Sequence, residues 1–273
     1  MRVRYPQFDF DSVPPHWCDN PEQAQVINAG NIIPAYIEPF LIRVMRKAKA
    51  QLDPVADAEL LADIDIFNKQ EGQHLKAHGA LMTMLRENGY EDMRAIEDAY
   101  AADYERFLAE KSLPWLLAYC EGFEAFGSTA AEKWVDGIVA GGIAGAHPVV
   151  VELFRWHLAE EYEHRTVSNR LYERLGSRGG PVVAYFRRLF GVFYAAKHMM
   201  GYAKELEQFL IAKDREQMSA DERAASEARL KVAKKAKRAA PSTKNALRIL
   251  TPWYDPAKTA PPRCQEEVLA SYA

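Results

Sequence analysis

The segment RWHLAEEYEHRTV, residues 155–167, carries four ionisable side chains at helical spacing. On an α-helix each residue advances by about 100° around the axis. Relative to His157, Glu161 then lies at about +40°, His164 at about −20° and Glu160 at about −60°. These four side chains therefore share one face of a predicted helix.

Two interpretations of this face are open. A surface helix usually carries its ionisable groups on the solvent side, so the carboxylates could form a solvated acidic face, with the histidines at a helix–helix contact. Alternatively, the face looks inward and its carboxylates and imidazoles bind metal ions. Glu163 is expected to point away from this face. Other segments of the chain favour the second interpretation.

A second Glu/His pair occurs in FNKQEGQHLKAH, residues 67–78. Glu71 and His74 stand at i and i+3, so both can reach one point from adjacent turns. His78 lies one turn further along the same face. This segment offers the same donor types as residues 155–167.

Two further segments place carboxylates among apolar neighbours. YCEGFEAF, residues 119–126, holds Glu121 and Glu124 at i and i+3, and PAYIEPFLIRVMR, residues 34–46, holds Glu38. Either glutamate of the first segment could face the interior. Four predicted helices thus each offer a carboxylate, and two of them add a histidine.

This is the ligand pattern of two-metal carboxylate sites in four-helix bundles, in which two helices give one Glu each and two give Glu-x-x-His. Buried carboxylates offset the repulsion between two cations, whereas without metal they are costly to keep ionised. Oxygen-rich ligation with imidazole suits iron or manganese better than structural zinc. One Glu-x-x-His pair is a weak signal, but two pairs about 90 residues apart favour a metal site.

The remaining pattern is helical almost throughout. Helices are expected over residues 22–50, 55–88, 93–111, 114–140, 148–175, 181–212 and 219–238, with Pro and Gly between them. No segment shows a sustained strand pattern. The predicted fold is all-α: a ferritin-like four-helix bundle with additional helices and extended terminal segments. Residues 1–240 are expected to form one di-metal domain with an N-terminal strap over 1–21, and residues 241–273 an extended arm.

Composition narrows the functional classes. The 273-residue chain is 48% hydrophobic, enough for a substantial core, and its net charge of −3 gives no general attraction to nucleic acid. The N-terminus lacks the apolar core of a secretory signal. The three cysteines are far apart and predict reduced thiols and a cytoplasmic location; they are Cys18, Cys120 and Cys264.

Two helical segments are candidates for contact with another molecule. Residues 181–203 are strongly apolar, but Arg187, Arg188 and Lys197 make a membrane span improbable. A largely buried or interfacial helix is favoured there over a channel lining or a membrane contact, and a homodimer is possible. The basic residues 229–238 are expected to form a solvated face rather than a site for nucleic acid or lipid.

The motifs together resemble the bacterial family labelled "predicted metal-dependent hydrolase", over roughly residues 5–205. They are Glu38-x4-Arg43-x2-Arg46, Phe67-x2-Gln70-Glu71-x2-His74-x3-His78, Glu124-x7-Glu132 and Trp156-His157-x2-Glu160-Glu161-x2-His164. The C-terminal segment departs from the resemblance, because Trp253-Tyr254-Asp255-Pro256 stands where the family often shows Phe-His-Pro.

A more distant resemblance is to the ferritin-like di-iron arylamine N-oxygenases. Their final His-x-x-x-Glu-x-x-His element is matched by His157, Glu161 and His164. The resemblance implies two iron ions, with manganese or zinc as alternatives. It also implies seven ligands: Glu38, Glu71, His74, Glu124, His157, Glu161 and His164.

Four more residues are candidates for catalytic or supporting roles. Glu121 could replace Glu124 as a ligand, but the spacing from Glu124 to Glu132 fits the family pattern. His78 and Glu160 are expected to orient ligands. For Arg43, a buried ion pair with a carboxylate and an ordinary helix face are equally open.

The leading functional prediction is a non-haem di-iron oxidase or oxygenase that uses O₂ to oxidise a small apolar or aromatic substrate. It would need an external electron donor, because the chain carries no flavin or nicotinamide fingerprint. The alternative is a metal-dependent hydrolase that uses a water activated by two metals, with Glu121 or Glu160 as general base. A non-enzymatic metal-binding helical protein is the third possibility.

Overall fold

The computed structural model describes residues 1–139, 142–239, 247–262 and 265–272, with side chains described outside 128–139 and 236–239. These residues form helices and contain no strand, which confirms the all-α class. The main helices are α1 (Pro21–Gly30), α2 (Ile32–Lys49), α3 (Ala58–Leu85), α4 (Arg94–Glu110), α5 (Leu113–Val139), α6 (Pro148–His164), α7 (Val167–Leu171), α8 (Pro181–Asp214), α9 (Ala220–Ala239) and α11 (Gln265–Ala270).

Two expected helices are each divided in two. The range 22–50 breaks between Gly30 and Ile32, because Pro34 has no N–H to donate to the Gly30 carbonyl. The range 148–175 breaks after His164, where the Arg165 guanidinium donates to the Tyr162 carbonyl at 2.7 Å. In both places a local side-chain effect ends a helix that hydrophobic periodicity would continue.

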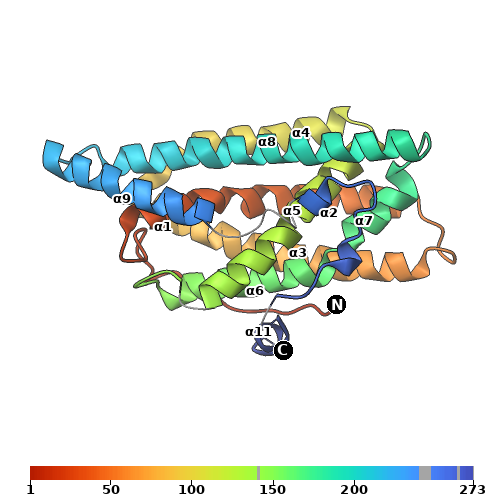
Figure 1. The fold of residues 1–273 in the computed structure, drawn as a ribbon, viewed down its shortest axis with the longest axis horizontal. Coiled ribbons are helices and arrows are strands. Elements are labelled where there is room, and N and C mark those ends of the chain that lie inside the picture. Colours follow the sequence, from red (N-terminus) through yellow and green to blue (C-terminus); the bar gives the residue numbers. More distant parts are fainter. Residues whose placement is uncertain (140–141, 240–246, 263–264, 273) are drawn as a thin grey trace.

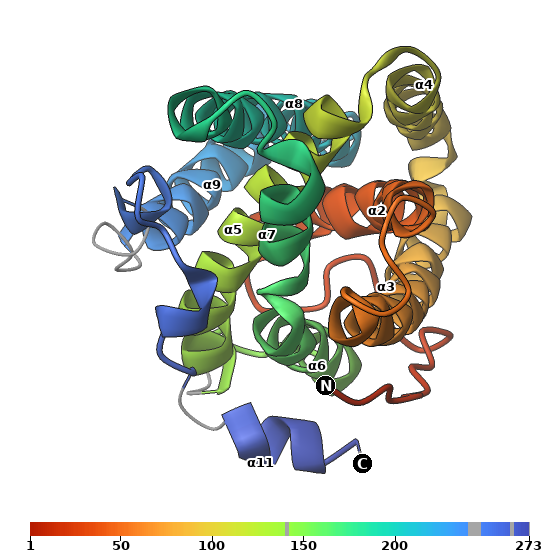
Figure 2. The ribbon, with the colours of Figure 1, turned by 90° about the vertical axis from the view of Figure 1, so that its right-hand side faces the viewer.

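Four helices surround the centre of the molecule. α2 packs on α3 and α5, and α6 packs on α5 and α3, so the four form a closed set of neighbours (Figure 2). α8 and α4 lie along the outer side of α2 and α5, as Figure 1 shows at the top of the view. The large apolar side chains of this set are buried, including Phe40, Phe67, Tyr119 and Trp156.

α5 and α8 approach each other closely through two glycines. A Cβ added at Gly122 would lie 2.7 Å from the backbone of Gly191 and Val192. A Cβ added at Gly191 would collide with the backbone carbonyl of Ala118. Only residues without a side chain allow the two helices to cross at this distance.

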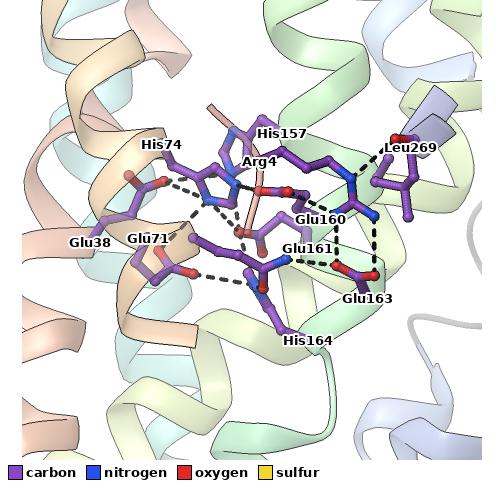
Figure 3. A network of polar contacts seen from close by, with 12 residues as sticks. Arg4, Glu38, Glu71, His74, His157, Glu160, Glu161, Glu163, His164 and Leu269 are labelled. Carbon is purple, nitrogen blue, oxygen red and sulfur yellow. Dashed lines mark hydrogen bonds and ion pairs between the residues drawn. The ribbon is translucent and has the colours of Figure 1, made fainter. Parts of the chain in front are cut away.

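The two ends of the chain cover α6. The N-terminal strap is extended as expected, and Arg4 within it bonds to α6 and to the Leu269 carbonyl (Figure 3). The C-terminal segment is less extended than expected, since it forms a turn of helix at Pro256–Lys258 and α11. Val268 of α11 packs against Leu158 of α6. None of the described helices is long and apolar enough to cross a bilayer.

Candidate metal centre

Seven buried donors meet at the centre of the four surrounding helices, and Figure 3 labels six of them, all except Glu124. α2 provides one carboxylate, α3 a Glu-x-x-His pair, α5 one carboxylate and α6 the His-x-x-x-Glu-x-x-His element. None of these residues is more than 6% exposed: Glu38, Glu71, His74, Glu124, His157, Glu161 and His164. The residues that the sequence places on inward faces are therefore brought together.

The donors fall into two groups that share Glu161. Ligand atoms of Glu38, His74, His157 and Glu161 lie within 4.8 Å of one another. Those of Glu71, Glu161 and His164 form a second group within the same distance. Glu161 Oε1 is 3.0 Å from His157 Nε2 and 3.4 Å from His164 Nε2. A carboxylate between two groups of donors is placed to bridge two cations.

Glu124 belongs beside the second group. Its Oε2 lies 3.7 Å from His164 Nε2, while Glu71 Oε1 lies 3.2 Å from the same nitrogen on the other side. Each of the two groups thus has at least one imidazole near a carboxylate from a different helix.

Most of the donor atoms have no hydrogen-bond partner within the described structure. This applies to both oxygens of Glu38, Glu71 and Glu124, and to Glu161 Oε2, His74 Nδ1 and His164 Nε2. More than about 90% of buried polar atoms in proteins are paired, so a cluster of unpaired ones requires an explanation. Carboxylate oxygens and imidazole nitrogens aimed at common points fit metal cations.

The pKa shifts of the buried glutamates also support a metal site. Burial, reinforced by neighbouring carboxylates, raises the pKa of Glu38, Glu71 and Glu124 well above its ordinary value. Burial alone would also raise the pKa of Glu161, but His164 and His157 hold it well below the ordinary range. Several buried carboxylates are costly to ionise together, and cations among them would reverse that cost.

Each histidine of the cluster is held through the ring nitrogen that faces away from it. Glu160 Oε2 accepts from His74 Nε2 at 3.0 Å, which leaves His74 Nδ1 directed at the carboxylates. Glu160 Oε1 in turn accepts from Arg4 Nη1 at 2.9 Å. Such contacts fix the tautomer and orientation of a metal-binding imidazole.

Two residues, Asn31 and His78, orient His157. The Asn31 side-chain amide donates to the His78 carbonyl at 3.0 Å, so its oxygen faces His78 Nδ1 and accepts that proton. His78 Nε2 then accepts from His157 Nδ1, 2.6 Å away. The lone pair of His157 Nε2 is thereby left for the cluster.

Gln70 orients His164 in the same way, by accepting the proton on its Nδ1. Its Nε2 donates to Glu163 at 2.7 Å and to the Arg2 carbonyl at 3.0 Å. The Gln70 oxygen therefore faces His164 Nδ1, 3.2 Å away, and accepts its proton. Glu163 does point away from the cluster, toward the N-terminal strap.

Two further candidates from the sequence, Glu121 and Arg43, lie outside the two donor groups. Glu121 is one turn from Glu124, but its Oε1 is engaged by Arg188 at 3.3 Å and Asn169 at 3.4 Å, so it stands outside the two donor groups. Arg43 is not a buried partner of a carboxylate. Its side chain is 48% exposed and pairs with exposed Glu105 of α4, because residue 43 lies on the outward face of α2.

Several residues that position the donors were not predicted from the sequence. Gln70 appeared only as a member of a motif, and its place one residue before Glu71 was a usable signal. Arg4 and Asn31 gave no local signal, because their partners are at least 47 positions away in the chain. The side chain of Glu132 lies outside the described residues.

A model of the family described as "predicted metal-dependent hydrolase" matches residues 2–260 of the chain, a span that includes every donor of the cluster. No curated protein and no solved structure matches the chain.

Proposed function

The chain belongs to the family of predicted metal-dependent hydrolases, and we propose that it hydrolyses a small-molecule substrate at a dinuclear metal centre. The observation that carries this proposal is the concentration of unpaired, buried carboxylate and imidazole atoms in two adjoining groups. Neither a solvated acidic face nor an ordinary helix contact accounts for them.

We assign the ligands by position. Glu38, His74 and His157 would hold one cation, and Glu71, Glu124 and His164 the other, with Glu161 between them. The oxygen-rich donor set suits iron or manganese, and zinc is also compatible with it. When bound, the two ions would supply Lewis acidity, which makes water a better nucleophile near neutral pH and stabilises negative charge in the transition state.

Of the two candidate general bases, we favour Glu121, because it keeps an unpaired carboxylate oxygen one turn from Glu124. Both oxygens of Glu160 are engaged, by Arg4 and by His74, so we assign Glu160 a positioning role. Glu121 keeps one buried oxygen, Oε2, without a partner. Burial raises the pKa of Glu121, which favours proton transfer nearer to neutral pH.

His78 is likewise a positioning residue in this proposal. It holds the proton on His157 Nδ1 and transmits the orientation set by Asn31. Replacing such a partner typically lowers metal affinity about 10–100-fold while the fold persists.

Oxygen activation at two irons is the second candidate. The observation that favours it is the donor set itself, with four carboxylates and three imidazoles in a buried cluster, because oxygen-rich and imidazole ligands suit redox metals. This function would need O₂ and electrons from a separate donor. A small apolar or aromatic substrate would suit the buried surroundings.

We also propose that residues 1–240 act as one helical domain with its strap over 1–21, and that residues 241–273 form a C-terminal arm, whose described parts contact both α8 and α6. The ferritin-like relationship and a cytoplasmic location remain part of the proposal; the buried, unpaired thiols of Cys18 and Cys120 agree with a reducing compartment.

The first test is metal stoichiometry. The full chain is produced with supplemental iron, manganese or zinc and analysed for bound metal. We expect two ions per chain, and loss of one or both in Glu71→Ala and Glu161→Ala with helicity kept. Glu59→Ala, at an exposed site on α3, serves as the matched control and should retain both ions.

The second test separates the two chemistries. Loaded protein is assayed against esters, amides and phosphoesters without oxygen, and the reduced iron form is then mixed with O₂ while oxygen consumption is followed. Anaerobic turnover that disappears in Glu121→Gln supports hydrolysis. Oxygen consumption without hydrolysis transfers the assignment to the second candidate, and a protein that binds no metal refutes both.

A further inference from the structure

α8 exposes an apolar stripe to solvent. The exposed fractions are 47% for Val183, 62% for Phe186, 50% for Phe190, 59% for Phe193 and 46% for Met200. The opposite face of the helix is buried against α5, where Gly191, Val192 and Ala195 lie. The stripe therefore faces outward from a helix that is already anchored in the fold.

The stripe has the spacing of a helix–helix seam. Its positions follow one another at intervals of 3, 4, 3, 4, 3 and 4 residues: Val183, Phe186, Phe190, Phe193, Lys197, Met200 and Lys204. Apolar residues that alternate at three and four positions meet a second helix with knobs packed into holes.

The apolar area is about that of a protein interface. Together with Val182, the exposed apolar side chains of the stripe offer roughly 600 Å². A standard interface covers about 800 Å² on each partner, with an apolar core surrounded by a polar rim. The stripe alone is large enough to be such a core.

We propose that α8 pairs with α8 of a second copy of this chain, in antiparallel orientation about a two-fold axis near Phe193. The reason for the orientation is charge. In a parallel pair Lys197 and Lys204 would each face the same residue of the partner, and like charges at an interface are unfavourable. In an antiparallel pair, Lys197 and Lys204 no longer face the same lysines of the partner.

The antiparallel register also gives each group a suitable neighbour. Phe186 meets the partner's Met200. The two lysines lie within one position of opposing Phe190 and Val183, so Lys197 can reach the ring of the partner's Phe190 in a cation–π arrangement. Phe193 meets the partner's Phe193 close to the axis. No candidate metal ligand lies on α8, so this inference stands independently of the proposed function.

A lipid surface is the less favoured occupant. Residues 177–204 contain no acidic side chain, which would suit anionic lipid. However, α4 packs against α8 and carries the exposed carboxylate of Asp98, which anionic lipid would repel.

Solution mass tests the pairing. The full chain, loaded with metal, should sediment at twice its 30.9 kDa mass. Phe186→Glu combined with Phe193→Glu should sediment as a monomer, with helicity and metal content unchanged. Val232→Glu, at an apolar site of α9 that is 64% exposed, should leave the dimer intact. A monomeric wild type, or a dimeric double variant, overturns the proposal.

Cysteine cross-linking tests the orientation. In a Cys264→Ser background, Phe193→Cys should form an intermolecular disulfide on oxidation. Phe186→Cys should cross-link to Met200→Cys in a mixture of the two variants but not to itself. Self-cross-linking of Phe186→Cys would show a parallel pair. A monomer that co-sediments with vesicles of phosphatidylcholine and phosphatidylglycerol would replace the protein partner by a lipid surface.

Discussion

Glu161 stands where the two donor groups meet, and its position depends on a residue that has no side chain. A Cβ at Gly127 of α5 would collide with Glu161 Oε2 and would lie 3.5 Å from its carboxyl carbon. Glu161 is 2% exposed, so a displaced carboxylate would have to move within the buried cluster. Gly127 therefore leaves space for the Glu161 carboxylate, which lies between the two donor groups. The helix itself does not require glycine at this position.

Gly127→Ala is expected to displace Glu161 and to weaken metal binding at least about tenfold, with the helical fold retained. Alanine favours an α-helix over glycine by about 1 kcal/mol, so local helix stability should not fall. Metal titration monitored by calorimetry, together with circular dichroism, measures both properties.

Gly72→Ala provides the matched control. Residue 72 follows the candidate ligand Glu71 on α3, and a Cβ there meets no atom within 4 Å. The control should bind metal as the wild type does. Equal affinity in both variants would show that Glu161 does not depend on the space at Gly127.

At the scale of helices, the contact between α5 and α8 sets the position of the Glu124 helix. Gly191→Ala places a Cβ against the Ala118 carbonyl, and backbone cannot rotate aside as a side chain can. We expect a loss of about 3 kcal/mol or more in the free energy of unfolding, at the upper end for overpacked sites. Urea denaturation measures it.

The same helix contains its own control. A Cβ at Gly201 of α8 meets nothing within 4 Å, so Gly201→Ala should leave the stability unchanged or raise it by up to about 1 kcal/mol. Similar denaturation midpoints for Gly191→Ala and the wild type would mean that α5 and α8 are free to separate.

The N-terminal strap is attached to the end of α8 by a titratable pair. His16 Nε2 is 2.8 Å from Asp214 Oδ2, and this hydrogen bond raises the pKa of His16 despite partial burial. Burial would raise the pKa of Asp214, but bonds from His16, Tyr90 and Gln25 outweigh it and lower that pKa.

The sign of the pH dependence follows. A raised pKa in the folded state means that His16 contributes fully below its unfolded pKa of about 6.5 and loses that contribution as the pH rises through the folded value. His16 is 41% exposed, so solvent screening limits the effect to about 0.2–1 kcal/mol. Melting temperatures from pH 6 to 9 should fall less in His16→Gln than in the wild type; parallel curves would contradict the assignment.

At the scale of the whole molecule, metal bound among the buried carboxylates would couple the stability of the fold to metal concentration. A cation that binds only the folded chain stabilises it, by about 2.7 kcal/mol per site at a free concentration about 100 times Kd. Chelation should therefore lower the melting temperature of the loaded protein, and added metal should restore it. Glu161→Gln should reduce this response, whereas Glu59→Gln should not. A melting temperature indifferent to chelator would contradict a metal-coupled fold.

The sequence by itself determined the all-α class and which residues could act as donors. Helical periodicity is a local property, so the spacing within residues 155–167 and 67–78 fixed which carboxylates and imidazoles share a face. The apolar neighbours of Glu38 and Glu124 indicated that their faces turn inward. Each of these inferences uses residues within a few turns of one another.

Only the tertiary structure decided how the donors are held. The roles of Asn31 and Arg4, the placement of Glu121 against Arg188, and the need for Gly127 and Gly191 all depend on the rotation and separation of helices that are distant in the chain. The outward direction of Arg43 has the same origin. Periodicity defines a face but not its neighbour, because packing of the whole core sets the angle and distance at which two helices meet.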